Sequence, residues 1–331
     1  MTHSAVTVPA FTAGFAARNR VETLALATAT TMRIGGPATV VTVEDRTDLP
    51  EILGRPHRWL GRGANLLVGD EGISEPVVRL GAAFGKLEIE ALGGARSRVR
   101  VGAAHDLAAL VTACVRAGLA GPEGLAGVPA TVGGALRMNA GTASCWMSDW
   151  VARVEVVLPG EDRPRWLERA AMSASYRNSG LPDGTLFLGC EMELAHGDPE
   201  VLRARAAALK KAKSDTQPLA LASAGCVFRN PLPTLPAGKL IDELGLKGTA
   251  IGGAQISTVH ANFIVNPGRA ARAADVVALI RLIRGRAWRE RAVVLNIEIE
   301  PWACPDELRA HPRDLSPRDQ TAMDTVMGLA S

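Results

Sequence analysis

The 331-residue chain, with 47% hydrophobic and 21% charged side chains, is large enough to bury a sizeable core and form two or three domains, which excludes a disordered or fibrous protein. Its formal net charge is only +3, and its lysines and arginines are interspersed with acidic residues. Since a protein that binds a phosphate backbone presents a basic stripe, nucleic acid is excluded as a partner.

The five cysteines offer neither a metal site nor a disulfide framework. They lie far apart, and the sequence contains no Cys-x-x-Cys or His-x-x-x-His pair. No metal is therefore expected, and free thiols indicate a reducing, cytoplasmic location. The cysteines are Cys114, Cys145, Cys190, Cys226 and Cys304.

Residues 4–17 are uncharged, but they do not predict a secretory signal. Arg18 and Arg20 follow this stretch, whereas a signal peptide has its basic residues in front. Elsewhere charged residues interrupt the apolar runs well before the roughly 20 residues needed to cross a bilayer. No membrane segment is expected.

The predicted elements begin after an N-terminal tail, residues 1–19. Short β-branched runs alternate with glycine turns from about residue 38 to residue 80, which is typical of strands joined by tight loops. Further on, apolar residues at helical spacing predict an amphipathic helix that Asp106 caps and Gly118 ends. The apolar positions of this helix are Leu107, Leu110, Val111 and Val115.

Downstream of this helix, the patterning predicts two strands, a polar stretch and two further helices. They are, in order, strands at 151–157 and 186–194, a stretch rich in arginine and lysine at 197–217, and helices at 239–244 and 275–288. Helices and strands mix without a regular βαβ repeat, so we expect α+β domains and not a doubly wound nucleotide-binding fold. A tail is predicted after Trp302.

Two glycine-rich segments are candidate ligand loops. The first, residues 61–67, places small residues where a backbone must turn sharply and expose amide groups, as loops that wrap a diphosphate do. Taken alone, it is better explained by a hairpin between strands. The second, residues 127–141, has few side chains to pack a core, and so many glycines cost entropy unless something approaches the backbone closely.

The two segments together favour a large ligand that carries phosphate. Neither shows Gly-x-Gly-x-x-Gly opening a helix after a strand, so a Rossmann site is not indicated. Neither segment has a Walker lysine.

Eight sequence strings within residues 20–300 closely resemble the UDP-N-acetylenolpyruvoylglucosamine reductase family of bacterial flavoenzymes. Each string is modest, but eight in family order make coincidence implausible. The strings are TTMRIGGPA (30–38), GRGANLLVGD (61–70), GLAGVPATVGGALRMNAG (124–141), SYRNSG (175–180), SAGCVFRNP (223–231), GLKGTAIGGAQIS (245–257), HANFIVN (260–266) and LNIEIE (295–300).

This resemblance implies an α+β fold, with a two-subdomain FAD-binding unit of the vanillyl-alcohol-oxidase type and a C-terminal α+β substrate-binding domain. The implied bounds are 20–82 and 83–197 for the two FAD-binding subdomains, 198–303 for the substrate domain and 304–331 for a C-terminal tail. Arg33 to Gly36 would support the first subdomain. The residues implied to bind FAD are Gly61, Arg62, Gly63, Ala64, Asn65, Leu66, Gly127, Val128, Pro129, Thr131, Val132, Gly133, Gly134, Asn139, Ala140 and Gly141.

The resemblance also implies a reaction with two cofactors, a bound FAD and NADPH. NADPH would reduce the flavin and leave, and the enolpyruvyl ether of a UDP-sugar would then receive hydride from flavin N5 at its terminal vinyl carbon. The carbanion formed beside the carboxylate is in effect an enolate, whose charge must be stabilised before a proton arrives. The product would be UDP-N-acetylmuramate, a peptidoglycan precursor.

Three residues match family positions that serve this chemistry. Arg177 can place a guanidinium fork on the developing oxyanions, with Glu298 as its partner or as an acid. Cys226 stands where the family places its proton donor, commonly serine; a thiol with a pKa of about 8.5 is mostly protonated at neutral pH yet gives up its proton more readily than a hydroxyl. Without the surrounding strings, we would assign these residues to the core or to the exposed surface.

The catalytic carboxylate cannot be chosen from spacing alone, because Glu300 lies on the same face of an extended strand as Glu298. We select Glu298 because its distance from Leu295 fits the family. The residues implied to contact the substrate are Tyr176, which would shape the pocket, and Arg229 and Asn230, which would contact the UDP diphosphate.

Some positions depart from the family pattern. Ala130 replaces a usual glycine, so the backbone there should avoid positive φ or accept strain. Residues 142–146 replace the usual Ala-Tyr-Gly. Since Tyr176 is the only tyrosine, the separate substrate-clamping tyrosine loop of one branch is absent, which places the chain with the shorter, second type.

Two alternatives remain open from the sequence. One is another FAD-linked oxidase of the same fold, in which Cys226 and Arg177 would be incidental and substrate alone would reduce the flavin. The other is a non-catalytic protein that binds a flavin or a nucleotide sugar. The joint presence of Arg177, Cys226 and Glu298 speaks against the second.

Overall fold

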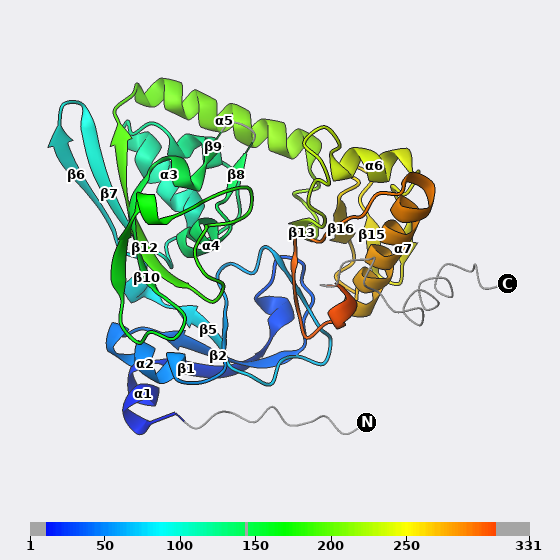
Figure 1. Cartoon of the computed structure of the whole chain (residues 1–331), viewed down its shortest axis with the longest axis horizontal. Helices are drawn as coiled ribbons and strands as arrows, with labels where there is room; N and C mark the ends of the chain where they lie inside the picture. The colour runs from blue at the N-terminus through cyan, green and yellow to red at the C-terminus, as the bar shows by residue number, and fades with distance from the viewer. Residues whose placement is uncertain (1–10, 143–144, 309–331) are drawn as a thin grey trace.

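The computed structural model describes residues 11–142 and 145–308, whose strands form three larger sheets and two small ones (Figure 1). The larger sheets have the orders β1-β2-β5-β3, β11-β10-β12-β7-β6 and β13-β16-β15-β14. In chain order the strands are β1 (Arg20–Ala25), β2 (Pro37–Val43), β3 (Arg58–Trp59), β4 (Leu66–Val68), β5 (Val77–Leu80), β6 (Leu87–Gly93), β7 (Arg96–Gly102), β8 (Gly141–Thr142), β9 (Cys145–Trp146), β10 (Val151–Val157), β11 (Arg165–Glu168), β12 (Leu186–Ala195), β13 (Ala222–Cys226), β14 (Ala250–Ile251), β15 (Ala254–Ile256), β16 (Phe263–Asn266) and β17 (Glu300–Trp302).

The α-helices cover these sheets and connect them. They are α1 (Ala13–Arg18), α2 (Leu49–Leu53), α3 (Leu107–Arg116), α4 (Val132–Arg137), α5 (Pro199–Thr216), α6 (Ala237–Glu243) and α7 (Ala273–Arg291). None of the helices formed by residues 11–142 and 145–308 is long and apolar enough to cross a membrane.

The first sheet joins three short parallel strands, β2, β5 and β3, to the antiparallel edge strand β1. From its second residue on, β2 is buried on both faces, as a valine-rich central strand of a parallel sheet should be. One face packs with α1 and α2 in a core that also contains Val157, Leu186 and Leu188 of the second sheet. The first and second sheets therefore share apolar contacts.

The second sheet is antiparallel, and α3 and α4 contribute to the core on one of its faces. Helix α3 begins and ends as predicted: the Asp106 side chain accepts a hydrogen bond from the N–H of Ala109 at 3.0 Å, and Gly118 adopts a φ of +67° just beyond it. A buried carboxylate, Glu191, pairs with Arg153 at 2.7 Å and with Arg100. These cations offset the cost of burying it.

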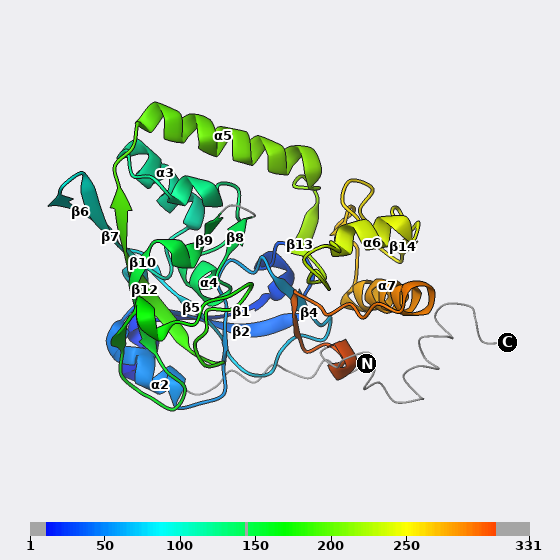
Figure 2. The same cartoon turned by 45° about the horizontal axis from the view of Figure 1, so that its top comes forward.

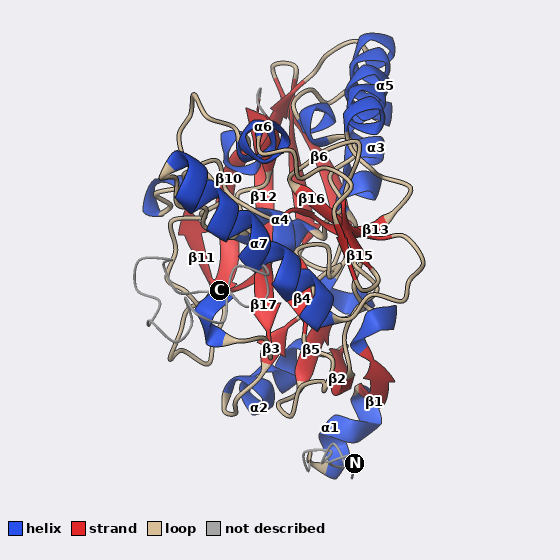
Figure 3. Ribbon diagram, turned by 90° about the vertical axis from the view of Figure 1, so that its right-hand side faces the viewer, coloured by secondary structure: helices blue, strands red, loops and turns tan. Residues whose placement is uncertain are grey.

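The third sheet packs against α6 and α7, and α7 crosses in front of it in Figure 3. Both helices were predicted, although α7 is longer than the 275–288 expected. Gly245 has a φ of +70° beyond α6, so it ends that helix as expected. The N-terminus of α7 is tied to the first sheet region, because Asp70 accepts the Ala273 N–H at 2.9 Å.

Helix α5 extends from the second sheet to the third along one side of the molecule (Figure 2). It is the polar stretch of the sequence, and its Leu202 is buried in the core of the second sheet, against which Ala206 and Leu209 also pack. The expected substrate domain, 198–303, would include this helix, but its packing places it with the second sheet.

The C-terminal segment returns to the first sheet region. Strand β17 pairs in parallel with β4, so that Glu300 lies opposite Leu66. A C-terminal tail was expected from residue 304, but residues 304–308 pack against the rest of the protein. Leu308 is 1% exposed, and the buried Arg284 side chain donates to the Leu308 carbonyl oxygen at 3.1 Å. The rest of that tail lies outside the described residues.

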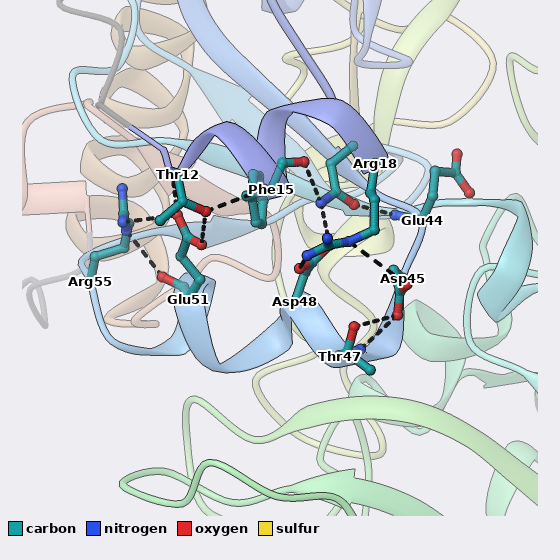
Figure 4. A network of polar contacts seen from close by, with 10 residues as sticks. Thr12, Phe15, Arg18, Glu44, Asp45, Thr47, Asp48, Glu51 and Arg55 are labelled. Atoms are coloured by element: carbon teal, nitrogen blue, oxygen red, sulfur yellow. Dashed lines mark hydrogen bonds and ion pairs between the residues drawn. The ribbon is translucent and has the colours of Figure 1, made fainter.

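The expected N-terminal tail also differs from the structure, because residues 13–18 form α1. Phe15 is fully buried in the first core, and Arg18 pairs with Asp48 beside α2 (Figure 4). Asn19 donates to the same Asp48 carboxylate at 2.6 Å and accepts the N–H of Glu44 at 2.7 Å. Residues 1–10 lie outside the described part of the chain.

Replacing Phe15 with alanine should lower the free energy of unfolding by about 3 kcal/mol, because it removes a fully buried ring from a packed core. Urea denaturation followed by circular dichroism measures this change. The matched control is Val201→Ala on α5, whose side chain is 53% exposed, and it should change stability by less than about 0.5 kcal/mol. Equal effects of the two substitutions would contradict the docking of α1.

Candidate active site

A cavity of about 760 Å³ is bordered by all three larger sheets and by both glycine-rich segments. The segments touch, since a Cβ placed on Gly61 would lie 2.8 Å from the Thr131 Oγ1. The volume is within the range of cofactor sites. The two candidate loops, recognised separately in the sequence, therefore face one common space.

The first glycine-rich segment is shaped by a glycine that no other residue can replace. Gly63 has a φ of +66°, and a Cβ there would lie 2.3 Å from the carbonyl oxygen of Ala29. The Gly63 carbonyl accepts the Thr31 N–H at 3.1 Å, and the Thr31 hydroxyl donates to the Ser223 carbonyl at 2.7 Å. The segment is thus tied to β13.

Asn65 connects the same segment to the C-terminal part of the chain. Its side-chain amide donates to the carbonyl oxygen of Glu298 at 3.2 Å, and its own carbonyl accepts the Glu300 N–H at 2.8 Å. Asn65 therefore fixes the backbone that carries Glu298.

The second segment contains a short helix, α4, that the sequence analysis did not predict. Thr131 caps it, because its hydroxyl accepts the Gly134 N–H at 3.3 Å. Val132 and Leu136 are buried in the core of the second sheet. The few apolar side chains of this segment therefore do pack in a core at these two positions.

The backbone of the second segment avoids strain at its one unusual residue. Ala130 has no positive φ, whereas Gly127 has a φ of +77°. Glycine therefore occupies the left-handed position at residue 127, Asn139 takes a second one with a φ of +40°, and the alanine stands where any residue fits.

Most of the residues expected to bind FAD line the cavity, but Val132 and Asn139 do not. Val132 is fully buried, and Asn139 is only 3% exposed. The residues that do line it are Gly61, Arg62, Gly63, Ala64, Asn65, Leu66, Gly127, Val128, Pro129, Thr131, Gly133, Gly134, Ala140 and Gly141.

Asn139 supports the turn that carries Arg177. Its amide donates to the Ser175 carbonyl at 3.0 Å, and its Oδ1 accepts the Ser148 N–H at 3.0 Å. Ser175 and Asn178 exchange two backbone hydrogen bonds, of 2.9 and 3.1 Å, and Arg177 within this turn has a φ of +56°. A left-handed arginine is an uncommon conformation, and here the surrounding hydrogen bonds hold it in place.

Arg177 and Glu298 form an ion pair at the cavity wall. The Arg177 Nε donates to Glu298 Oε1 at 2.6 Å, and the Tyr176 hydroxyl donates to Oε2 at 3.3 Å. The two charged side chains are 22% and 9% exposed. Burial opposes the positive charge, but the Glu298 carboxylate raises the pKa of Arg177 above its ordinary value.

Cys226 ends β13 and lies opposite Phe263 of β16, with its side chain lining the same cavity. Burial, reinforced by the Glu298 carboxylate, raises the pKa of the Cys226 thiol to about 12. The thiol therefore stays protonated at neutral pH, and it is a weaker acid than the free thiol considered from the sequence. The preceding Gly225, with a φ of +82°, would place a Cβ in open space.

Asn262 is a supporting residue that the sequence analysis missed. Its side chain accepts the Phe228 N–H at 2.9 Å and donates to the Phe228 carbonyl at 2.8 Å, while its own carbonyl accepts the Val227 N–H at 2.8 Å. Asn262 is 3% exposed, and its side chain slightly lowers the pKa of the Cys226 thiol, against the larger effect of burial. Its place within the string HANFIVN was the only available signal.

Two residues near the end of α5, Lys213 and Gln217, line the cavity and were also missed. Burial lowers the pKa of the Lys213 amine, with a smaller contribution from the positive charge of Arg177. Nothing in the polar stretch distinguished this lysine from its exposed neighbours, because only the position of the helix brings it to the cavity.

The residues expected to bind substrate lie outside the cavity lining. Tyr176 is 44% exposed and contacts Trp146 edge-to-face with ring centroids 5.8 Å apart. Arg229 is exposed, and Asn230 accepts the Ala237 N–H at 3.0 Å at the start of α6. Among the residues that the structure describes, no group of three or more His, Cys, Asp or Glu side chains could hold a metal ion.

The raised pKa of Cys226 predicts slow alkylation in flavin-free protein. At pH 8.5 iodoacetamide should modify Cys226 at least about tenfold more slowly than free cysteine, because very little thiolate is present. Peptide mass spectrometry measures the rate. The rate should keep rising about tenfold per pH unit beyond pH 9, a slope that restricted access alone does not produce. A plateau near pH 9 would contradict the raised pKa.

Two family models match the sequence, and both matched ranges contain residues that line this cavity. Residues 37–162 match an FAD binding domain, and residues 217–302 match the C-terminal domain of UDP-N-acetylenolpyruvoylglucosamine reductase. The first match and the two-subdomain arrangement define an FAD-binding oxidoreductase of the vanillyl-alcohol-oxidase fold type with an added α+β domain.

Relatives along nearly the whole chain identify the family. A UDP-N-acetylenolpyruvoylglucosamine reductase of Thermus thermophilus is 42% identical over 86% of this chain and 99% of its own length. That of Desulfosudis oleivorans is 39% identical over 82% and 90%. A crystal structure of the enzyme from Thermus caldophilus superposes with a TM-score of 0.76 at 40% identity, covering 86% of this chain and 99% of that one.

The chain belongs to the UDP-N-acetylenolpyruvoylglucosamine reductase family. It is therefore an FAD-dependent oxidoreductase of peptidoglycan precursor synthesis, as the resemblance of its sequence strings implied. The cavity fits FAD, since its volume of about 760 Å³ is that of a cofactor site and a Cβ on Gly225, which lines it, would enter open space. The alternatives of another oxidase or a non-catalytic binding protein are not supported.

Proposed function

We propose that this chain reduces the enolpyruvyl double bond of a UDP-sugar, with FAD held between residues 61–66 and 127–141. The supporting observation is that Arg177, Glu298 and Cys226 border the same cavity as both glycine-rich segments. Bound FAD supplies the hydride, and NADPH is the proposed reductant of the flavin. NADPH must act before the sugar substrate, because only a reduced flavin can donate hydride.

Arg177 is proposed to stabilise the negative charge that develops on the substrate carboxylate. Its Nε faces Glu298, which orients the planar guanidinium so that it can present a fork of donors to the oxyanion. The charge of Glu298 keeps Arg177 protonated. In this proposal Glu298 acts as the partner of Arg177, which its engagement by Tyr176 also supports.

Cys226 is proposed to deliver the proton that completes the reduction. The buried thiol carries that proton at neutral pH, and Asn262 fixes the backbone of the nearby Phe228. The nearby negative charge of Glu298 disfavours a thiolate at Cys226. The thiol therefore gives up its proton only when the negatively charged intermediate is present to accept it. The Cys226 thiolate left behind is then close to Arg177, whose charge favours it.

The substrate diphosphate is proposed to lie towards Arg229 and Asn230, with Tyr176 at the entrance. Asn230 already accepts a backbone N–H through Oδ1, so its amide group is the part offered to phosphate. Lys213 adds a cation at the cavity wall and would attract a ligand with several negative charges.

Location and domain limits are also proposed. The five cysteines are free thiols in the structure, which supports the cytoplasm as the site of action. Each of the ranges 20–82, 83–197 and 198–303 contains one larger sheet. The packing of Leu202 supports starting the substrate domain near residue 217, where the C-terminal family match begins, instead of at 198.

Replacing Cys226 tests its role as proton donor. In stopped-flow experiments Cys226→Ala should be reduced by NADPH at the normal rate but be reoxidised by the enolpyruvyl substrate at least about a hundredfold more slowly, because no acid replaces the thiol. Cys226→Ser is the matched variant and should retain activity, since a hydroxyl can also supply a proton. Normal reoxidation of Cys226→Ala would sink the assignment.

Replacing Arg177 with lysine separates charge from geometry. The lysine keeps the positive charge but loses the guanidinium fork, so kcat should fall about a hundredfold. Reduction of the flavin by NADPH and the flavin content should be unchanged. Arg116→Lys on α3 is the control, and it should leave all three quantities unaltered. A normal kcat for Arg177→Lys would show that a point charge is sufficient.

A further inference from the structure

Arg79, the third residue of β5, is a cation on the cavity wall that the catalytic proposal does not use. Its Nε atom is buried without a hydrogen-bond partner. Thr42, which lies opposite it on β2, also has a buried hydroxyl oxygen without a partner. Buried polar groups are normally satisfied, so two adjacent exceptions need an explanation.

No carboxylate in the described part of the chain lies within ion-pair distance of Arg79. Glu22 acts on it only at longer range, and Arg20 adds an opposing positive charge. Burial is the main cause that lowers the pKa of the guanidinium. The surrounding protein therefore does not compensate the charge.

Arg284 shows how this fold satisfies a buried arginine when the role is structural. Its guanidinium donates to the carbonyl oxygens of Leu295, Glu307 and Leu308, at 2.9, 3.3 and 3.1 Å. Arg79 makes no comparable set of contacts among the described residues. It also faces the cavity, which Arg284 does not.

The position of Arg79 within the cavity indicates which part of the ligand it meets. The parallel strands β2, β5 and β3 point their carboxyl ends towards this region, and ligands of such sheets bind beyond the carboxyl ends. Trp59 and Leu80 line the cavity at these strand ends, but Leu80 points to the opposite face of the sheet from Arg79. On the face of Arg79, Leu60 and Trp302 line the cavity and pack with Val77, two residues before Arg79.

The reacting groups lie elsewhere along the cavity. Cys226 is on β13, which belongs to the third sheet, and β5 lies on the side of β12 and away from β13 in Figures 1 and 2. FAD has its flavin at one end, its adenosine at the other and its diphosphate between them. With the flavin beside Cys226 and the diphosphate between the glycine-rich segments, the adenosine must occupy the region of Arg79.

We propose that Arg79 binds the adenosine half of FAD, donating hydrogen bonds to acceptor atoms of the adenine ring or ribose. This inference rests on the proposed seat of the diphosphate in the two glycine-rich segments. Arg79 would then make the site select FAD over flavins that lack the adenosine half, because only FAD reaches the unsatisfied guanidinium.

The test compares FAD with FMN, which lacks the adenosine and the phosphate attached to it. Flavin-free full-length protein is titrated with each flavin, and binding is followed by quenching of flavin fluorescence. Arg79→Met should weaken FAD binding by about tenfold or more and leave FMN binding unchanged, the loss expected for one charged hydrogen-bonding group. Arg79→Lys should recover part of the FAD affinity.

Arg20→Met is the matched control, since Arg20 lies in the same cross-strand row of the sheet with a 65% exposed side chain. It should leave both affinities unchanged. Equal losses for FAD and FMN in both Arg79 variants would assign Arg79 to the structure and overturn the proposal. So would a normal FAD preference in Arg79→Met. If the wild-type protein itself bound FMN as tightly as FAD, the seat of the diphosphate would be wrong as well.

Discussion

The backbone ladder along residues 296–302 is the interaction on which the rest of the site depends. On one side the Glu298 N–H donates to the Val227 carbonyl at 2.7 Å, next to the strand that ends in Cys226. On the other side the Glu300 N–H donates at 2.8 Å to the backbone carbonyl oxygen of Asn65, which belongs to the first glycine-rich segment. One extended segment thereby sets the distances between carboxylate, thiol and flavin loop.

The sequence predicted correctly those elements whose spacing and capping residues lie within or next to the element itself. Helix α3 follows from its apolar spacing, its Asp106 cap and Gly118, all of which can be read without tertiary contacts. Helices α1 and α4 were not predicted, because they are six residues each and depend on packing: Phe15 is buried by one core, and Val132 by another. Short helices have little intrinsic stability, so their sequences carry little signal.

The candidate site was recoverable to the extent that its residues belong to recognisable strings. Arg177, Cys226 and Glu298 meet at one cavity although they come from three separate parts of the chain. String membership does not say which way a side chain points, and Val132 and Asn139, both expected to bind FAD, are buried and do not line the cavity. Lys213 and Arg79 lie in ordinary polar or strand patterning, and only the assembled sheets and helix bring them to the cavity.

Residue 226 carries a thiol where the resembled family commonly has a hydroxyl, and the charges of Glu298 and Arg177 act on the pKa of this thiol. A carboxylate beside a thiol raises its pKa, whereas the guanidinium of Arg177 lowers it. Burial and the Glu298 carboxylate keep the thiol protonated, whereas the Arg177 guanidinium favours the thiolate, so the charge of a bound ligand can shift this balance.

The pairing of β17 with β4 has a consequence for how the chain is made. It pairs Leu66 with Glu300, about 234 positions later in the chain, so it is among the most non-local contacts in the described residues. A ribosome-bound chain that has not yet released residues 296–302 carries both glycine-rich segments and Cys226, but neither Glu298 nor strand β17. Synthesis therefore delivers both glycine-rich segments early, whereas the cavity that they share with Glu298 cannot assemble until residues 296–302 have emerged.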